Sequence, residues 1–360
     1  MKKVQLKDVC LKATSKYAQK DLKDKEGKFA IYGASGLIKY IDVFECDEEY
    51  VAVVKDGAGV GRTLFLPAKT SVIGTLQYLL PKDNIVPKYL YYAVKNMHLE
   101  KYRTGSTIPH IYFKDYQNEK FQLPGKEEQM KVVRILDKLE MVLQEKDEQL
   151  KNMERLIKSR FVEMFGDPVS NSYGLPAATL PELGEFGRGV SKHRPRNDPN
   201  LLGGEYPLIQ TGDVANAGLY ITSYNSTYSE FGLKQSKMWG KGTLCITIAA
   251  NIAKTAILEF DACFPDSVVG FTANENTNNI FIHYWFSFFQ AILESQAPES
   301  AQKNINLKIL SELKVIVPKK EKQDEFVEFI NRVDKSKLLV QKSLEQTQQL
   351  FDSLMQKYFS

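Results

Sequence analysis

The sequence predicts an α+β protein with two β-rich domains, each followed by a long α-helix. The two helices are expected to pack as an antiparallel coiled coil with pseudo-twofold symmetry. Three observations support this fold: two stretches carry an apolar seam of heptad type, the second half of the chain repeats the first, and the remaining sequence is rich in short strand-like runs. We expect domains at residues 1–125 and 167–318, and helices at residues 126–166 and 319–360.

Each predicted helix has ten seam positions at alternating spacings of three and four residues, and eight of the ten are apolar. Neither seam contains Gly or Pro between its first and last position, as an unbroken helix requires. An apolar seam needs a partner, so the simplest arrangement packs the two helices against each other. The seam residues on which this prediction depends are Leu136, Leu139, Leu143, Leu150, Ile157, Ile330, Val333, Val340, Leu344 and Phe351.

The internal repeat is visible without any structural information. Every seam position of the second helix equals a position of the first plus 194, with no insertion or deletion over 33 residues. The two helix beginnings, residues 123–129 (LPGKEEQ) and 317–323 (VPKKEKQ), match at the same offset. Farther upstream the offset drifts: residues 60–63 match 252–255 at 192, and residues 71–74 match 267–270 at 196. The chain is therefore a tandem repeat of one unit, a domain followed by a long helix.

The domains themselves are rich in Tyr, Val, Ile, Thr and Gly, which favours strands joined by irregular loops. Few helices are expected within them. The clearest strand predictions are residues 50–54, 63–66, 244–248 and 255–260, and the clearest helix predictions are residues 89–97 and 280–293.

Composition and charge exclude several protein classes. The net charge is +4, divided as +6 over residues 1–125, 0 over 126–166, −3 over 167–318 and +1 over 319–360, which permits a nucleic-acid partner without demanding one. No apolar run approaches the roughly 18 residues that span a bilayer, and no secretory signal is visible, so we expect no membrane partner and a cytoplasmic protein. The four cysteines and four histidines are widely spaced, so neither a disulfide framework nor a metal site is expected.

No catalytic constellation is found. Residues 56–61 (DGAGVG) resemble a nucleotide or methyl-donor loop, but such loops open a helix and the residues that follow read as a strand. A glycine-rich hairpin is the better interpretation. The E-x-K triplets at residues 26–28 and 312–314 lack a suitably placed Asp, and no G-x-S-x-G, H-E-x-x-H or P-loop motif occurs.

Binding residues are better indicated, because polar and basic side chains gather on loops that the repeat places in equivalent positions. Such side chains contact phosphates and base edges, although a solvated charged surface is the alternative for any single cluster. The predicted DNA-binding residues are the basic cluster Arg188, Lys192, His193, Arg194 and Arg196; the hairpin residues Arg62, Thr63, Asn251 and Lys254; the loops Gly105, Ser106, Thr107, Gln302, Lys303 and Asn304; and Ser35, Lys39, His110, Gln210 and Thr211.

Over its whole length the chain resembles the specificity (S, or HsdS) subunit of a type I restriction-modification enzyme. The resemblance rests on the duplicated domain-plus-helix layout, on the two helix beginnings and on the C-terminal helix at residues 346–359. It extends to five segments within the domains: residues 31–37 (IYGASGL), 192–198 (KHRPRND), 207–214 (PLIQTGDV), 246–253 (ITIAANIA) and 263–269 (CFPDSVV).

The resemblance implies two target recognition domains that each read one half of a split double-stranded DNA site. It also implies two methyltransferase (M) subunits that modify adenine and restriction (R) subunits that translocate and cut unmodified DNA. The helices would then set the spacer between the half-sites and dock those partners. S-adenosylmethionine, ATP and magnesium are expected on the partner subunits, so this chain is expected to be non-catalytic and without a cofactor.

Two rival functions compete with this one. A self-contained DNA methyltransferase would need a methyl-donor loop that opens a helix and an N/D-P-P-Y/F-type catalytic segment, and the sequence shows neither. A coiled-coil scaffold that does not bind DNA is the second rival. It would leave the duplication of the whole domain-plus-helix unit without a reason.

Overall fold

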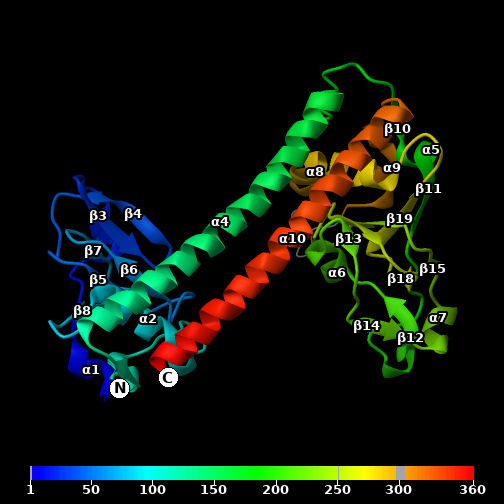
Figure 1. Cartoon of the computed structure of the whole chain (residues 1–360). Helices are drawn as coiled ribbons and strands as arrows, with labels where there is room; N and C mark the ends of the chain where they lie inside the picture. The colour runs from blue at the N-terminus through cyan, green and yellow to red at the C-terminus, as the bar shows by residue number, and fades with distance from the viewer. Residues whose placement is uncertain (1, 250, 297–304) are drawn as a thin grey trace. The chain divides into compact units, whose positions relative to one another are not determined.

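The computed structural model describes residues 2–249, 251–296 and 305–360, and it forms two compact units (Figure 1). Unit 1 contains residues 1–149 and 340–360, and unit 2 contains residues 150–339. Each unit therefore holds one β-rich domain, the beginning of the long helix that follows that domain, and the end of the other long helix.

The two long helices are confirmed as α4 (Lys126–Phe165) and α10 (Lys320–Phe359), of 40 residues each. At 1.5 Å per residue each is about 60 Å long. They pack together, in opposite directions within each unit (Figure 1). In unit 2, Phe161 near the end of α4 lies against Phe326 near the start of α10, with ring centroids 5.4 Å apart. In unit 1, Leu136 of α4 and Phe351 near the end of α10 share one core.

Burial along the seam is uneven. Near the two ends of each helix the seam is covered by a domain helix as well as by the other long helix: α2 (Pro87–Asn96) in unit 1 and α8 (Asn279–Gln296) in unit 2. Away from these ends, the seam side chains are only partly covered and keep part of their exposure. The buried seam residues are Leu136, Ile157, Ile330, Val333 and Phe351, and the half-buried ones are Leu139, Leu143, Leu150, Val340 and Leu344.

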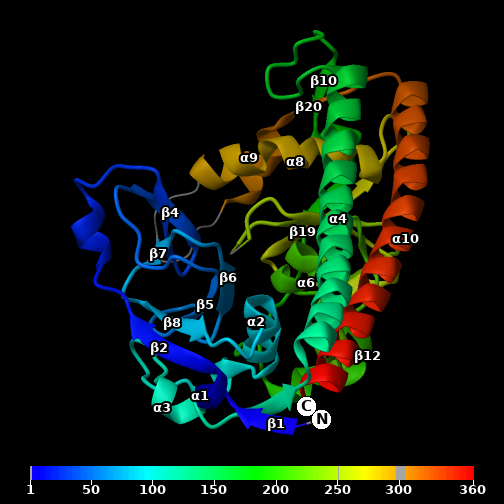
Figure 2. The ribbon, with the colours of Figure 1, turned by 60° about the vertical axis from the view of Figure 1, so that its left-hand side comes forward.

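The main sheet of unit 1 has four antiparallel strands (Figure 2). The continuous apolar run of its central strand explains why every residue of that strand is buried. The strand order is β2 (Cys10–Thr14), β8 (Leu76–Pro81), β5 (Tyr50–Val54) and β6 (Thr63–Leu66). A second sheet has the order β4 (Gly36–Ile41), β3 (Phe29–Gly33) and β7 (Ser71–Val72), and β1 (Lys2–Gln5) pairs with β9 (Lys120–Leu123).

Unit 2 is built in the same way with two additional strands. Its main sheet has the order β11 (Gly184–Arg188), β19 (Val268–Ala273), β16 (Leu244–Thr247), β17 (Thr255–Leu258) and β13 (Tyr220–Ile221). Its second sheet has the order β14 (Ser226–Tyr228), β12 (Leu202–Leu208), β18 (Ala262–Cys263) and β15 (Met238–Trp239), and β10 (Ala177–Thr179) pairs with β20 (Lys314–Ile316).

The strand orders show which elements are equivalent. The order β2-β8-β5-β6 matches β11-β19-β16-β17, and β7 joins β3 in parallel as β18 joins β12. One sequence match was wrong: residues 71–74 do not correspond to 267–270. Residues 71 and 72 form β7, whose counterpart is β18, whereas residues 268–270 belong to β19, whose counterpart is β8. A four-residue apolar segment ending in Gly is too short to fix a register that sheet hydrogen bonds determine.

The predicted domain helices are present as α2 and α8. No helix in the described ranges is both long enough and apolar enough to cross a membrane. The shorter α-helices are α1 (Leu6–Val9), α3 (Phe113–Tyr116), α5 (Leu180–Leu183), α6 (Thr211–Asn216), α7 (Glu230–Lys234) and α9 (Leu307–Glu312), and 3-10 turns lie at Gln19–Leu22, Leu99–Tyr102 and Pro199–Leu201.

Candidate nucleic-acid interface

The glycine-rich segment of unit 1 is a hairpin loop, as predicted, and not a phosphate-binding turn. It joins the antiparallel strands β5 and β6, so no helix begins at its end. Gly57 and Gly61 have φ values of +92° and +89°, in the region that favours glycine. A Cβ at Gly61 would lie 2.5 Å from the backbone nitrogen of Glu100, so the loop packs closely on the 3-10 turn at Leu99–Tyr102.

Three loops that are distant in the sequence meet at this end of the unit 1 sheet. Arg62 donates a hydrogen bond of 2.9 Å from Nη1 to the carbonyl oxygen of Ala34 in the β3–β4 turn. The backbone nitrogen of Gly57 donates to the carbonyl oxygen of Pro109 at 2.9 Å, and Asp56 forms an isolated bridge with His110. The predicted residues Ser35, Arg62 and His110 therefore belong to one surface. Ser35, Asp56 and Arg62 also line a cavity of about 500 Å³.

The remaining predicted residues of unit 1 differ in their surroundings. Gly105, Ser106 and Thr107 are exposed at the tip of a tight loop, whose ends are held by two 2.9 Å backbone hydrogen bonds between Thr104 and His110. Lys39 points back into its own unit, where Nζ donates to the carbonyl oxygen of Leu22 at 3.0 Å. The structure places Thr63 at the start of β6, opposite Val53.

In unit 2, the strand pairing brings the predicted loops to the corresponding end of the main sheet. Arg188 ends β11 and pairs with Val269 at the start of β19, which pairs with Ile246 near the end of β16. The basic loop that follows Arg188 and the β16–β17 loop that carries Asn251 therefore start from the same sheet end. Gln302, Lys303 and Asn304 lie outside the described residues.

Acidic side chains brace the basic loop of unit 2. Arg196 Nη2 lies 2.5 Å from Asp266 Oδ1, and Arg194 Nη2 lies 3.6 Å from the other oxygen of the same carboxylate. His193 Nε2 lies 2.9 Å from Asp198 Oδ2. The backbone N–H of Asn200 and the His193 ring hydrogen-bond to the Asp198 carboxylate and lower its pKa, so it stays ionised. Neither acidic partner was predicted from the sequence.

The backbone of the same loop is also held in place. Gln235 Oε1 accepts hydrogen bonds from the backbone nitrogens of Lys192 (2.7 Å) and His193 (3.0 Å). Arg194 Nη1 donates to the carbonyl oxygen of Ser191 at 2.6 Å. The side chains of Arg188 and Lys192 are exposed. The loop therefore presents cations from a fixed backbone, which reduces the ordering cost of binding.

Lys254, Gln210 and Thr211 do not join the basic loop in any contact that the structure shows. Gln210 precedes α6, where its backbone nitrogen donates to Asp213 Oδ2 at 2.8 Å, and Thr211 begins that helix. Lys254 lines a cavity of about 230 Å³ together with His283 of α8. Burial and the nearby charge of Lys337 lower the pKa of His283 to about 4, so its ring is neutral at pH 7.

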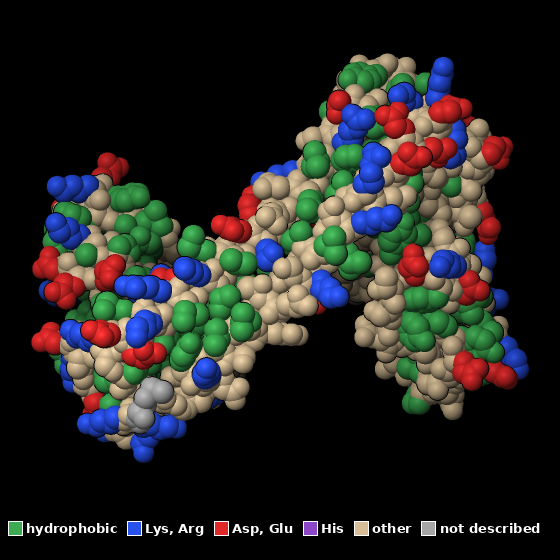
Figure 3. Space-filling model, in the orientation of Figure 1, with side chains coloured by type: hydrophobic (Ala, Val, Ile, Leu, Met, Phe, Trp, Pro, Cys, Tyr) green, Lys and Arg blue, Asp and Glu red, His purple; other side chains and the backbone are tan. Residues whose placement is uncertain are grey.

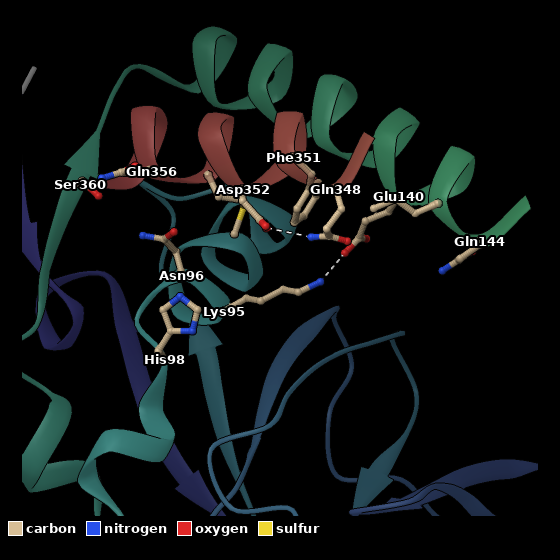
Figure 4. A pocket seen from close by; sticks show the side chains of 12 residues that line it. Lys95, Asn96, His98, Glu140, Gln144, Gln348, Phe351, Asp352, Gln356 and Ser360 are labelled. Carbon is tan, nitrogen blue, oxygen red and sulfur yellow. Dashed lines mark hydrogen bonds and ion pairs between the residues drawn. The ribbon is translucent and has the colours of Figure 1, made fainter. Parts of the chain in front are cut away.

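A cavity of about 820 Å³ lies in unit 1 among α2, α4 and α10 (Figure 4). Lys95 Nζ forms an ion pair of 2.6 Å with Glu140 Oε1, and Gln348 Nε2 donates to Asp352 Oδ1 at 2.8 Å (Figure 4). Its charged groups are thus largely satisfied by one another. None of the predicted DNA-binding residues lines this cavity.

All four cysteines are buried, and burial raises the pKa of Cys10 to about 12 and that of Cys46 to about 11, so these thiols are not activated nucleophiles. Within the described ranges, no group of three or more His, Cys, Asp or Glu residues is arranged to hold a metal ion. The loop ends of the two sheets offer hydrogen-bond donors, acceptors and cations on a fixed framework.

Comparison with known proteins gives a consistent result. A family model for the type I restriction modification DNA specificity domain matches residues 1–152 and 179–349. A putative type I restriction enzyme MjaX specificity subunit from Methanocaldococcus jannaschii is 21% identical over 292 residues, which cover 76% of this chain and 67% of that protein. The MjaVIII specificity subunit from the same organism is 25% identical over 142 residues. That match covers 39% of this chain and only 33% of the relative.

Solved structures share the fold. The S subunit of a type I restriction-modification system from M. genitalium is 18% identical, with a TM-score of 0.62, and the match covers 100% of this chain and 96% of that one. A chain from a structural study of complex assembly and conformational transition of the type I restriction-modification system is 15% identical, with a TM-score of 0.58. That match covers 99% of this chain and 97% of the other.

Proposed function

Because the chain belongs to the type I restriction-modification DNA specificity family, we propose that it is the specificity subunit of such a system. Each β-rich domain then reads one half of a bipartite double-stranded DNA site, and the chain itself performs no chemical step. One observation carries the proposal: the two main sheets share four strands in the same order, and both carry polar and basic loops at the corresponding end.

The loop side chains suit both kinds of contact that DNA recognition needs. Exposed cations such as Arg188 and Lys192 can neutralise phosphates, which positions a domain on the duplex. Arg62 is oriented by a neutral carbonyl acceptor and keeps further N–H donors for a base edge, and Ser106 and Thr107 offer hydroxyl groups at an exposed loop tip. We propose these five residues as the first contacts to test.

The long helices are proposed to set the spacer and to dock the partner subunits. Hydrophobic side chains remain exposed on their faces, interspersed with Lys and Arg (Figure 3). We propose that two methyltransferase (M) subunits bind these faces, that restriction (R) subunits join the full complex, and that S-adenosylmethionine, ATP and magnesium bind to those partners. The exposed apolar residues are Met130, Ile135, Met141, Leu156, Val162, Leu338, Leu339 and Leu350.

The decisive experiment is methylome sequencing of cells that carry this gene together with its partner M gene. We expect N6-methyladenine in both halves of one split sequence, and loss of all such methylation when this gene alone is removed. Methylation that persists without this chain, or methyl transfer by the purified chain alone, would contradict the proposal. A gel shift with and without M subunits separates DNA recognition from the scaffold alternative, which predicts no sequence-dependent shift.

A further inference from the structure

A buried glutamine ties the first turn of α4 to its own domain. Gln129 has no exposed surface, although its side chain is polar. Its Oε1 accepts a 2.7 Å hydrogen bond from the backbone nitrogen of Val86. Its Nε2 donates to the carbonyl oxygens of Asn84 (3.1 Å) and Pro124 (2.8 Å). The amide thus joins the long helix, the segment that leads into it and the loop that precedes α2.

Unit 2 contains the same arrangement. Gln323 in the first turn of α10 is also fully buried. Its Oε1 accepts a 2.9 Å hydrogen bond from Thr277 Oγ1, and its Nε2 donates to the carbonyl oxygens of Asn276 (3.0 Å) and Pro318 (2.9 Å). The acceptors are equivalent residues in the two repeats. We call Gln129 and Gln323, with these partners, the glutamine clamps.

Each glutamine clamp lies at the opposite end of a central strand from the recognition loops. In unit 1, β8 starts beside Thr75, whose carbonyl oxygen accepts a 2.9 Å hydrogen bond from Lys55 in the hairpin that carries Arg62. After six residues β8 ends at Pro81 and continues into the loop that Gln129 holds. The strand is about 20 Å long. In unit 2, β19 connects the β16 loop end to the loop that Gln323 holds in the same way.

We infer that Gln129 and Gln323 are positioning residues that fix the angle between each recognition domain and its long helix, and thereby the accepted spacer between half-sites. This inference rests on the proposed function. Hydrogen bonds are directional, so three from one buried amide define an angle that apolar packing alone would leave looser. A tilt of about 10° over about 20 Å moves the loops by about 3.5 Å, which is close to the 3.4 Å rise of one base pair.

The test uses the full chain with its M subunits in cells, and it reads the methylated motif. In Gln129→Leu and Gln323→Leu both half-sequences should stay unchanged, because no recognition loop is altered. The fraction of methylated sites with a spacer one base pair longer or shorter should rise about tenfold. Gln149→Leu on α4 and Gln341→Leu on α10 replace exposed glutamines of the same helices and should keep the wild-type spacer.

A milder variant guards against simple misfolding. Thr277→Val removes only the hydroxyl that donates to Gln323 and keeps the side-chain volume, so it should broaden the spacer less than Gln323→Leu does. An unchanged spacer in all three variants overturns the inference, whether or not total methylation falls. Loss of methylation at every spacer in all three assigns the glutamines to folding and also overturns it. If the wild-type chain gives no bipartite motif, the proposed function itself fails.

Discussion

The loop ends of the two main sheets have the same framework but different contents. In unit 1, Arg62 donates to a neutral backbone carbonyl, and the loop around it is rich in glycine and hydroxyl groups. In unit 2, Arg194 and Arg196 share the carboxylate of Asp266. The strand orders, the glutamine clamps and the long helices are repeated, whereas the loops are not. If each unit reads one half-site, as proposed, the repeated parts hold the recognition surfaces and the loops that differ give each unit its own sequence preference.

The first prediction has the largest expected effect, and it tests whether the two repeated halves of the chain are equivalent. In unit 1, Phe351 and Phe359 near the end of α10 complete the core, and in unit 2 Ile157 and Phe165 of α4 do so at positions 194 lower. A chain of residues 1–166 should therefore form a homodimer in which each copy supplies its own helix end to the other. Sedimentation at micromolar concentration should show the dimer. A folded monomer would show that the two helix ends are not interchangeable.

The second prediction tests the repeated helices as a ruler. Inserting one heptad into the middle of α4, after Lys146, and one into α10, after Val340, keeps the seam in phase and lengthens the pair by about 10 Å. At 3.4 Å per base pair the spacer should grow by about three base pairs. Methylome sequencing should show both half-sequences unchanged. An active variant with the original spacer would show that the helices do not determine it.

The third prediction compares Arg62 of unit 1 with Asp266, the carboxylate that distinguishes unit 2. Arg62→Ala should weaken DNA binding and reduce the salt dependence by about one charge if Arg62 contacts phosphate, or lower base discrimination by about 1–3 kcal/mol if it contacts a base edge. Asp266→Asn removes a negative charge beside two arginines, so we expect tighter non-specific binding with a steeper salt dependence.

Gel shifts of the complex over a range of salt concentrations measure both effects. Weaker and less specific binding by Asp266→Asn would mean that the carboxylate orients the arginines toward bases. Unchanged binding by Arg194→Ala and Arg196→Ala would mean that the basic loop is a solvated surface and does not contact DNA.

The smallest expected effect is a pH dependence confined to unit 2. The pKa of His283 is about 4 in the fold and about 6.5 in an unfolded chain, so between these values the unfolded state takes up a proton that the folded state does not. The free energy of unfolding should fall by about 3 kcal/mol as the pH decreases from 7 to 4. Denaturant titrations should show this loss to be smaller in His283→Gln. An equal loss in that variant would rule out His283 as the cause. Helix α2 of unit 1 contains no histidine, so we expect no such pH dependence from that helix.

The elements that were predicted correctly are those with a local signal. The continuous apolar run at residues 50–54 marks a buried strand, and the unbroken heptads mark α4 and α10. The glycines at residues 56–61 were correctly assigned to a hairpin, because a strand and not a helix follows them. In each case the residues that decide the structure are close neighbours in the sequence.

The contacts that escaped prediction join distant segments. Asp266 lies 70 residues from Arg196, and a carboxylate in a Pro-Asp-Ser turn carries no local sign of its partners. The repeat revealed that Gln129 and Gln323 match, but it could not show that both are fully buried or which carbonyl oxygens they bind. Pattern and spacing report the period of a helix or strand and its apolar face, whereas the burial of a polar side chain and the contacts between loops depend on the folded path of the chain.

Each unit contains the end of the long helix that follows the other domain, and this arrangement also affects how the chain folds during synthesis. Unit 2 is continuous in sequence, so a ribosome has delivered all of it once residue 339 has emerged. Unit 1 is synthesised first, yet its core includes Phe359, whose ring lies 4.8 Å from that of Tyr89. Until residues 340–359 have been made, the N-terminal domain therefore keeps part of its apolar surface exposed. We expect a nascent chain, or one terminated before α10 is complete, to engage chaperones through that surface.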